Sequence, residues 1–326
     1  MKIVYVLSSS ESDFYTEEAL VSMYSLKKHN PDVRITLVSD EDTLNSLQGK
    51  RGEIHKYIDD YVTLNLPAHF LPIQKSRYLK TSLRRIIDGT FLYIDNDTII
   101  TDTFNQDDIC SSDIGAVFNQ HKDDWTASQH FMTRTYRKQT GKELKDCQEI
   151  KHLFNGGVIF AKDTPKAHDF FNKWHELWME DSFNFNYHKD QPSMWRANHL
   201  CGDILYPIEG IFNCQLIYPV NCLRYFFNAK ILHYFSSAPM INHIKFKQPG
   251  ELQYIRENGI DDKIKNDIVN LRKEYINGLH IYEDSEVQYY DTPLTILAVK
   301  ISKMAPFINH SLRYIVKGYC KIFKKG

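Results

Sequence analysis

The segment 91–103, FLYIDNDTIITDT, restricts the fold more than any other stretch of the chain. Phe91–Ile94 is a run of aromatic and branched apolar residues, long enough for a buried strand and too short for a helix. Asp95, Asn96 and Asp97 then interrupt the run. Because an uncompensated buried carboxylate costs several kcal/mol, the two aspartates must meet solvent or a cation. Their spacing at a strand end suits a hard divalent ion such as Mn²⁺ or Mg²⁺, and an ordinary polar turn is the alternative.

The first forty residues predict a strand, a helix and a second strand. Lys2–Leu7 is apolar and ends in small polar residues, Thr16–His29 has an apolar helical face, and Arg34–Val38 is again apolar. A strand–helix–strand unit at this spacing predicts parallel pairing, with ligands bound at the carboxyl ends of the strands. We therefore expect an α/β fold.

Further apolar runs predict more elements of both kinds, and the polar segment 119–151 predicts a long excursion that carries substrate contacts. The aromatic residues of the helix after Pro165 are expected in the core. The predicted helices are Gln74–Ile87, Pro165–Met179, Asp190–Trp195 and Leu252–Tyr275, and the predicted strands are Ile114–Phe118, Val158–Ala161, Ile204–Tyr206, Gln215–Tyr218 and Ile231–Phe235.

Composition excludes some classes of protein. The 326 residues are 42% hydrophobic, enough for one large or two small domains, and the net charge of -1 argues against nucleic acid as a partner. The first residues form too short an apolar run for a signal peptide, and no window resembles a spanning helix, so we expect a cytoplasmic protein. The six cysteines form no C-x-x-C pair and are expected to be reduced.

The C-terminal residues differ from the body in charge. Residues 293–326 contain seven Lys or Arg and no acid, between apolar residues at helical spacing. This pattern predicts a helical basic extension that lies on an acidic membrane surface, which would make the protein peripheral on the inner face of the plasma membrane. Two helices packed on the body are the alternative.

Several motifs in sequence order resemble the nucleotide-sugar-dependent glycosyltransferases with a GT-A fold, most closely glycosyltransferase family 8. The resemblance covers roughly residues 1–235. The motifs are the strand Lys2–Ser9, the SRYLK helix with Arg77 and Lys80, Tyr93–Asp97, Phe154–Val158, Lys189–Gln191, Ile211–Asn213 and Leu232–Tyr234.

The resemblance implies a GT-A type, Rossmann-like mixed sheet flanked by helices, and a role for each matching residue. The catalytic domain is expected at 1–247, with a nucleotide-sugar half at 1–118 and an acceptor half at 119–247, followed by the helical extension 248–326. Asp95, Asp97 and His233 would bind Mn²⁺ or Mg²⁺, and Gln191 and Asp190 would lie under the sugar as catalytic residues. The donor-binding residues implied are Ser8, Ser9, Arg77, Lys80, Asp95, Asn96, Asn155, Gly156, Gly157 and Asn213.

The chain departs from the family after His233. The family pattern is His-x-x-Gly-x-x-Lys-Pro-Trp. This chain has neither the glycine nor the phosphate-binding lysine at the matching positions. Ser236, Ser237, Lys245 or Lys247 are the candidates to neutralise the diphosphate instead.

The implied function is metal-dependent transfer of a hexose from a nucleoside diphosphate sugar, expected to be a UDP-hexose. The acceptor would be a saccharide or lipid-linked saccharide in bacterial surface polysaccharide synthesis, with retention at the sugar carbon. Two alternatives stay open. The run Asp95-Asn96-Asp97-Thr98 also resembles the Asp-x-Asp motif of haloacid dehalogenase-like phosphatases, with Asp95 as nucleophile, and a non-catalytic binding module would share the same framework.

Overall fold

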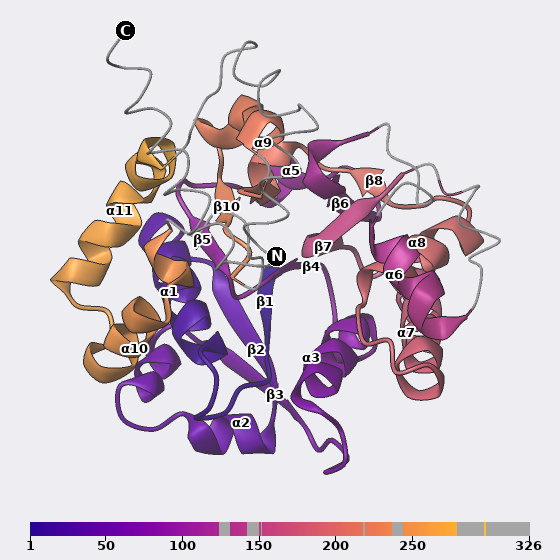
Figure 1. Cartoon of the computed structure of the whole chain (residues 1–326), viewed down its shortest axis with the longest axis horizontal. Coiled ribbons are helices and arrows are strands. Elements are labelled where there is room, and N and C mark those ends of the chain that lie inside the picture. The colour runs from indigo at the N-terminus through magenta and orange to yellow at the C-terminus, as the bar shows by residue number, and fades with distance from the viewer. Residues whose placement is uncertain are drawn as a thin grey trace, which may run out of the picture. The chain divides into compact units, whose positions relative to one another are not determined.

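The computed structural model describes residues 1–123, 131–141, 150, 152–217, 219–236, 244–278 and 297. The chain divides into a compact unit Met1–Asn277 and a second unit Gly278–Gly326, and Figure 1 shows the elements of the first. The first unit continues past residue 247, where the sequence suggested a boundary. The tail helices expected within 293–326 lie outside the described residues, apart from Leu297. Among the described residues, no helix has the length and apolar character needed to cross a bilayer.

The first unit is built on a seven-stranded mixed sheet in the order β3-β2-β1-β4-β7-β6-β8. The pairs β1–β2, β2–β3 and β1–β4 are parallel, and β7 runs antiparallel to β4 and β6. This pairing confirms the predicted mixed α/β class and the parallel opening unit. The strands are β1 (Lys2–Leu7), β2 (Arg34–Asp40), β3 (Asp60–Leu64), β4 (Phe91–Ile94), β6 (Ile114–Phe118), β7 (Phe154–Ala161) and β8 (Tyr206–Pro207).

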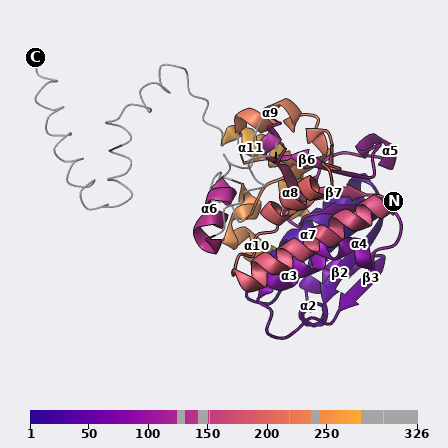
Figure 2. The same ribbon diagram turned by 90° about the vertical axis from the view of Figure 1, so that its right-hand side faces the viewer.

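Helices cover both faces of the sheet. Helices α3 (Pro72–Thr81), α4 (Leu83–Ile86) and α7 (Pro165–Asn184) lie on one face, and α1 (Tyr15–His29) lies on the other (Figures 1 and 2). Central strands between two helix layers are buried on both sides, which is why β1 and β4 are apolar almost throughout. The aromatic side chains of α7 belong to the core, as predicted: Phe170, Phe171, Trp174 and Trp178 are all fully buried.

A small second sheet brings distant residues beside the end of β4. Strand β10 (Ile231–His233) lies between β5 (Thr98–Ile100) and β9 (Cys214–Gln215). Its antiparallel register with β5 pairs His233 with Thr98. Because Thr98 follows Asp97 directly, this register places the histidine next to the aspartates.

Three predicted elements differ from those observed. The strand predicted at Val158–Ala161 begins earlier, because Phe154–Gly157 forms the first half of β7. The helix expected at 74–87 is divided into α3 and α4, and the helix expected at 252–275 is divided into α10 (Pro249–Asn258) and α11 (Asp262–Asn277). The second break has a clear cause, because Gly259 has a φ of 73°, a conformation that ends a helix and favours glycine.

The remaining elements are short. They are α2 (Glu41–Ser46), α5 (Gln106–Ile109), α6 (Phe131–Thr140), α8 (Gln191–Leu200), α9 (Pro219–Phe226) and the 3-10 turns Arg51–Lys56, Asn119–His121, Gly210–Asn213 and Lys245–Lys247.

Candidate active site

The strand order identifies where a ligand would bind. The chain proceeds from β1 outward to β2 and β3, then returns to add β4 on the other side of β1. In open α/β sheets, ligands bind outside the carboxyl ends of the strands at such a reversal. Here those ends lead into Ser8 and Ser9 after β1 and into Asp95 after β4.

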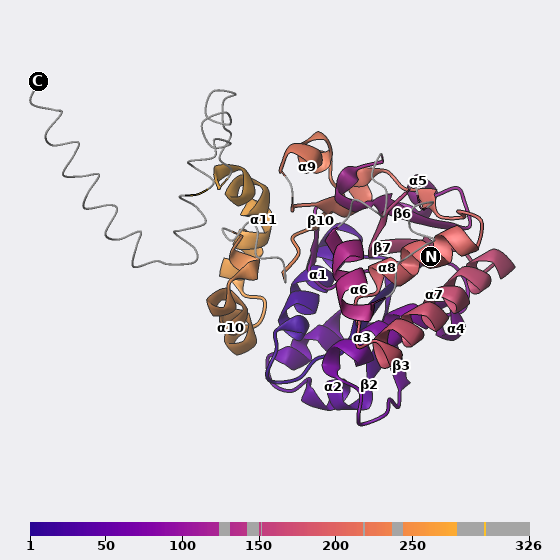
Figure 3. The same ribbon diagram turned by 45° about the vertical axis from the view of Figure 1, so that its right-hand side comes forward.

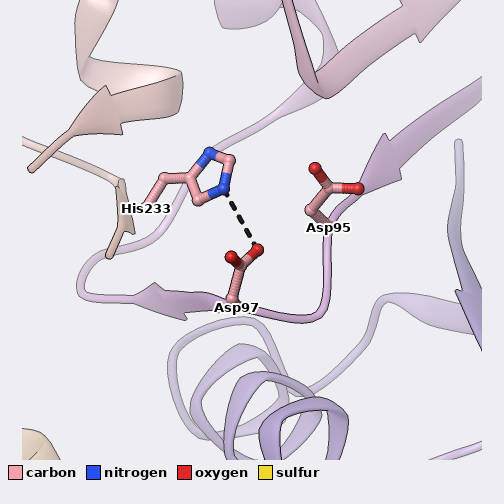
Figure 4. Close-up of side chains that lie close together, drawn as sticks. All are labelled: Asp95, Asp97 and His233. Atoms are coloured by element: carbon pink, nitrogen blue, oxygen red, sulfur yellow. Dashed lines mark ion pairs between the residues drawn. The ribbon is translucent and has the colours of Figure 1, made fainter. Parts of the chain in front are cut away.

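Asp95, Asp97 and His233 form a cluster of metal-ligating groups at this point. One ligand atom from each lies within 4.8 Å of the others, and Figure 4 shows the three side chains converging from the β4–β5 turn and from β10. His233 Nε2 is 3.1 Å from Asp97 Oδ1. Two carboxylates and one imidazole are a ligand set that suits Mn²⁺ or Mg²⁺. The sequence-based expectation that these three residues meet is confirmed.

A buried row of amides orients the histidine. His233 Nδ1 lies 3.0 Å from Asn213 Oδ1, and Asn213 Nδ2 donates to Asn155 Oδ1 at 2.9 Å. Asn155 Nδ2 contacts Asn119 Oδ1 at 3.5 Å. The side-chain oxygen of Asn213 can only accept a hydrogen bond, so Nδ1 faces Asn213 as the donor and Nε2 is the ring nitrogen on the side of Asp97, where a cation could bind it. The predicted donor-binding residues Asn155 and Asn213 therefore support the imidazole in this structure.

Gly157 allows β7 to lie against the imidazole. A Cβ at this position would be 2.4 Å from His233 Cε1 and 2.6 Å from Nδ1, closer than atoms can approach. At Gly156 a Cβ would meet nothing nearer than Lys80 Nζ, at 3.5 Å. Only the second glycine is thus required by the packing of the site.

An aromatic ring that the sequence did not single out also contacts the histidine. Phe235 stacks on His233 with ring centroids 3.8 Å apart and planes 7° from parallel. Its φ of 52° lies in the left-handed region, which is uncommon for a bulky residue. The stacked ring further fixes the orientation of the imidazole.

A second group of charges adjoins the cluster. Lys80 Nζ is 3.3 Å from Asp95 Oδ1 and 3.3 Å from Asp190 Oδ2, and Arg77 Nε is 3.1 Å from Asp190 Oδ1. Burial alone would raise the pKa of Asp190, but the charges of Arg77 and Lys80 outweigh it and hold the pKa below its usual range. Asp190 is therefore a carboxylate. Tyr93, the first residue of the motif Tyr93–Asp97, donates its hydroxyl proton to Asp95 Oδ1.

The environment of Asp97 keeps it ionised. Burial would raise its pKa, yet the adjacent His233 and the Ser236 amide, 2.9 Å from Oδ2, lower it to about 2. Nearby Glu18 shows the opposite behaviour, because burial and the charge of Asp97 raise its pKa well above the ordinary value. Burial and the neighbouring groups thus shift the pKa values of these two acids in opposite directions.

Other predicted donor-binding residues have roles in holding the backbone. The Ser9 hydroxyl donates to Asp13 Oδ1 at 2.5 Å and accepts from Arg51 Nη2 and Thr16 Oγ1, each at 2.9 Å. One donor and two acceptor sites are all that a hydroxyl has, so Ser9 positions the loop after β1. Asn96 Nδ2 donates to the Val6 carbonyl at 3.0 Å and ties the β4–β5 turn to β1.

The remaining predicted residues lie around the same point. Ser8 is buried at the end of β1, and Gln191 begins α8, with Nε2 3.4 Å from the Phe154 carbonyl. The two candidate phosphate-binding lysines differ in their surroundings. Lys245 pairs with Asp267 at 2.5 Å. Lys247 is half-buried, and its pKa is lowered by burial although the charge of Asp97 opposes this.

Comparison with known proteins gives matches among solved structures alone: no family model and no curated protein matches the chain. Mouse xyloside xylosyltransferase 1 has 12% identity and a TM-score of 0.48, over 73% of this chain and 99% of that one. The glycosyltransferase GlyE of Streptococcus pneumoniae has 16% identity and a TM-score of 0.46, over 82% and 62%. The galactosyltransferase LgtC, solved with donor and acceptor sugar analogs, has 15% identity and a TM-score of 0.45, over 82% and 100%.

Proposed function

We propose that this chain is a metal-dependent glycosyltransferase that moves a hexose from a nucleoside diphosphate sugar to a saccharide or lipid-linked saccharide. The observation that carries this proposal is the convergence of Asp95, Asp97 and His233 at the carboxyl end of β4, beside the reversal in strand order. Such a cluster suits a diphosphate ligand, whose charge needs a divalent cation as its counter-ion.

The chemistry follows from the charge that develops during transfer. Asp95, Asp97 and neutral His233 would hold Mn²⁺ or Mg²⁺, which neutralises the departing diphosphate. The Asn213 carbonyl keeps the His233 proton on Nδ1, so Nε2 remains a ligand atom. Asn155 and Gly157 support this arrangement from β7.

A second set of residues would face the sugar. The Asp190 carboxylate and the Gln191 amide would stabilise the positive charge that grows on the sugar carbon, which suits reaction with retention. Arg77 and Lys80 keep Asp190 ionised and aligned through contacts of 3.1 and 3.3 Å. Lys247 would contribute charge toward the diphosphate, in place of the lysine that the family pattern has after its histidine.

We favour glycosyl transfer over the phosphatase alternative because of His233. A phosphoaspartate mechanism uses Asp95 as nucleophile and Asp97 as acid or base. It has no use for an imidazole 3.1 Å from Asp97 that is oriented by its own buried amide.

The reaction class can be tested by ligand binding and turnover. Thermal shift with a panel of nucleoside diphosphates and their hexose derivatives, with and without Mn²⁺, should show a Tm increase that needs both components, because ligands stabilise the fold they bind. Release of nucleoside diphosphate from the best donor then identifies the sugar. Hydrolysis of a phosphate monoester without any nucleotide-dependent Tm shift would favour the phosphatase instead.

The acceptor and the cellular location form a second part of the proposal. A basic segment without acids at 293–326 suits an anionic bilayer, and an enzyme held there would meet lipid-linked saccharides of surface polysaccharide synthesis. Deleting residues 293–326 should move the protein from the membrane fraction to the supernatant. An unchanged distribution would contradict the membrane role of this segment.

A further inference from the structure

Arg256, near the end of α10, contacts the loop that follows β1. Its Nε and Nη2 atoms donate to the two oxygens of Glu17 at 2.8 and 3.1 Å. Nη1 donates to the Glu11 carbonyl at 2.8 Å, and Nη2 also donates to the Asp13 carbonyl. Figure 3 shows α10 beside α1, the helix that this loop enters. One guanidinium thus contacts the loop backbone at two points and the first turn of α1 at a third.

The contact continues to the end of β1 through buried charges. Glu17 is 1% exposed, and its Oε1 also pairs with Arg51 Nε at 2.9 Å. Arg51 in turn donates to Ser9 Oγ at 2.9 Å. A buried carboxylate needs its cations, because removing one partner of such a group is strongly destabilising. Arg256, Glu17, Arg51 and Ser9 therefore form a continuous link from the C-terminal helix to the donor side of the sheet.

The same guanidinium covers an aromatic ring of the loop. Its central carbon lies 4.5 Å from the centroid of the Phe14 ring. Phe14 is half-buried, whereas Glu11 and Ser12 before it are exposed. Two hydrogen bonds to the loop backbone and one cation–π contact hold a segment that has no regular structure, and two more hydrogen bonds fix the guanidinium on Glu17 of α1.

We propose that Arg256 is a positioning residue of the donor site. It fixes the β1–α1 loop, residues 8–14, in the conformation that binds the nucleotide. The identity of that ligand rests on the proposed function. The loop lies at the carboxyl end of β1, next to Asp95 after β4. A loop that is ordered before binding spares the ligand the entropy cost of ordering it. Helix α10 then contributes to donor binding by ordering the β1–α1 loop.

The test uses the full chain with Arg256→Met and Arg256→Lys. The methionine variant loses every polar contact, so hydrogen exchange of peptides spanning residues 8–16 should accelerate at least tenfold in the absence of ligand. The KM for the nucleotide sugar should rise about tenfold, with kcat changed less than threefold. Lysine retains one charge toward Glu17 without the planar fork, so its effects should be intermediate.

Arg272 on α11 provides the matched control. Its Nη2 donates to Thr101 Oγ1 at 2.9 Å and to the Ala229 carbonyl at 2.7 Å, so it also ties a C-terminal helix to the body. Arg272→Met should lower Tm, while exchange of residues 8–16 and the donor KM should stay as in the wild type. A merely structural role for Arg256 would give the same result for both arginines and would overturn the inference.

The two proposals fail in different ways. Unchanged loop exchange in both Arg256 variants would overturn the positioning role, whatever the ligand. A different result would separate the two proposals: Arg256→Met speeds hydrogen exchange of the loop, but the wild-type protein binds no nucleotide with Mn²⁺. That result would support the link between α10 and the loop and would contradict the nucleotide donor. A fall in kcat with an unchanged KM would also overturn the positioning role.

Discussion

His233 Nδ1 and Asn213 Oδ1 lie 3.0 Å apart, and on the other side of the ring His233 Nε2 lies 3.1 Å from Asp97 Oδ1. The two contacts fix the orientation of the imidazole, with Nδ1 toward Asn213 and Nε2 toward Asp97. The amide that orients the ring is itself fully buried and is held by Asn155. The geometry that the cluster offers to a cation therefore depends on a residue that is not among its three candidate ligands.

Asn213→Ala should weaken Mn²⁺ binding by about 10- to 100-fold, the usual effect of losing a hydrogen-bond partner behind a metal ligand. Isothermal titration with Mn²⁺ in the presence of UDP measures it. Asn213→Asp retains an acceptor for Nδ1–H and should bind within about tenfold of the wild type. Equal affinity in the alanine variant and the wild type would show that His233 needs no partner.

The two adjacent glycines of β7 should respond differently to alanine. Gly157→Ala places a methyl group 2.4 Å from His233 Cε1, so the ring must move and Mn²⁺-dependent activity should fall at least about 100-fold. Gly156→Ala meets nothing closer than 3.5 Å and should keep most of its activity. Similar losses in both variants, measured by nucleoside diphosphate release, would contradict the placement of His233 against Gly157.

Lys80→Met should destabilise the protein in a Mn²⁺-dependent way. The ammonium is almost fully buried between Asp95 and Asp190, and removing it leaves two carboxylates short of a cation, at a cost of about 3 kcal/mol. Bound Mn²⁺ compensates Asp95, so the loss in unfolding free energy should shrink when Mn²⁺ is present. Urea denaturation with and without the metal measures both values.

Lys75 on the same helix is the control for this variant. Its ammonium lies 2.7 Å from Asp42 and 3.8 Å from the buried Asp40, and neither carboxylate belongs to the candidate metal site. Lys75→Met should therefore have an effect on the unfolding free energy that Mn²⁺ does not change. A Lys80→Met cost that is independent of Mn²⁺ would place the metal away from Asp95.

Acid should destabilise the fold partly through His175. Burial, with a smaller effect from Arg85, lowers the pKa of His175 to about 4 from its ordinary 6.5. Between these values the unfolded chain binds a proton that the folded chain does not, so stability falls as pH drops through this range. His175 should account for about 2 kcal/mol of the loss between pH 7 and 5. His175→Gln should lose less stability than the wild type over that interval, and parallel urea denaturation profiles would exclude this role.

The sequence predicted the parts of the site that depend on local pattern and motif order. Asp95 and Asp97 end an apolar run, and the ordered motifs pointed to His233 as their partner, which the β5–β10 register confirms. The observed break at Gly259 differs from the prediction of one helix, because helical periodicity on both sides gave no sign of its positive φ.

Pairings over long sequence distances that no motif marks could not be predicted in this way. Arg256 and Glu17 are 239 residues apart, and each alone looks like an ordinary charge on a helix. Asn213 was expected at the donor, yet its amide contacts His233 and Asn155. Which neighbour a short polar side chain meets depends on strand order and register, neither of which a local pattern contains.

The most direct test of the proposed function is a titration of Mn²⁺ into the wild type and Asp97→Ala, each with saturating UDP. We predict one saturable Mn²⁺ site in the wild type and at least about 100-fold weaker binding in Asp97→Ala, because the variant lacks one of three protein ligands. Equal Mn²⁺ affinity in the two proteins, or no saturable binding in the wild type, would contradict a metal site at Asp95, Asp97 and His233.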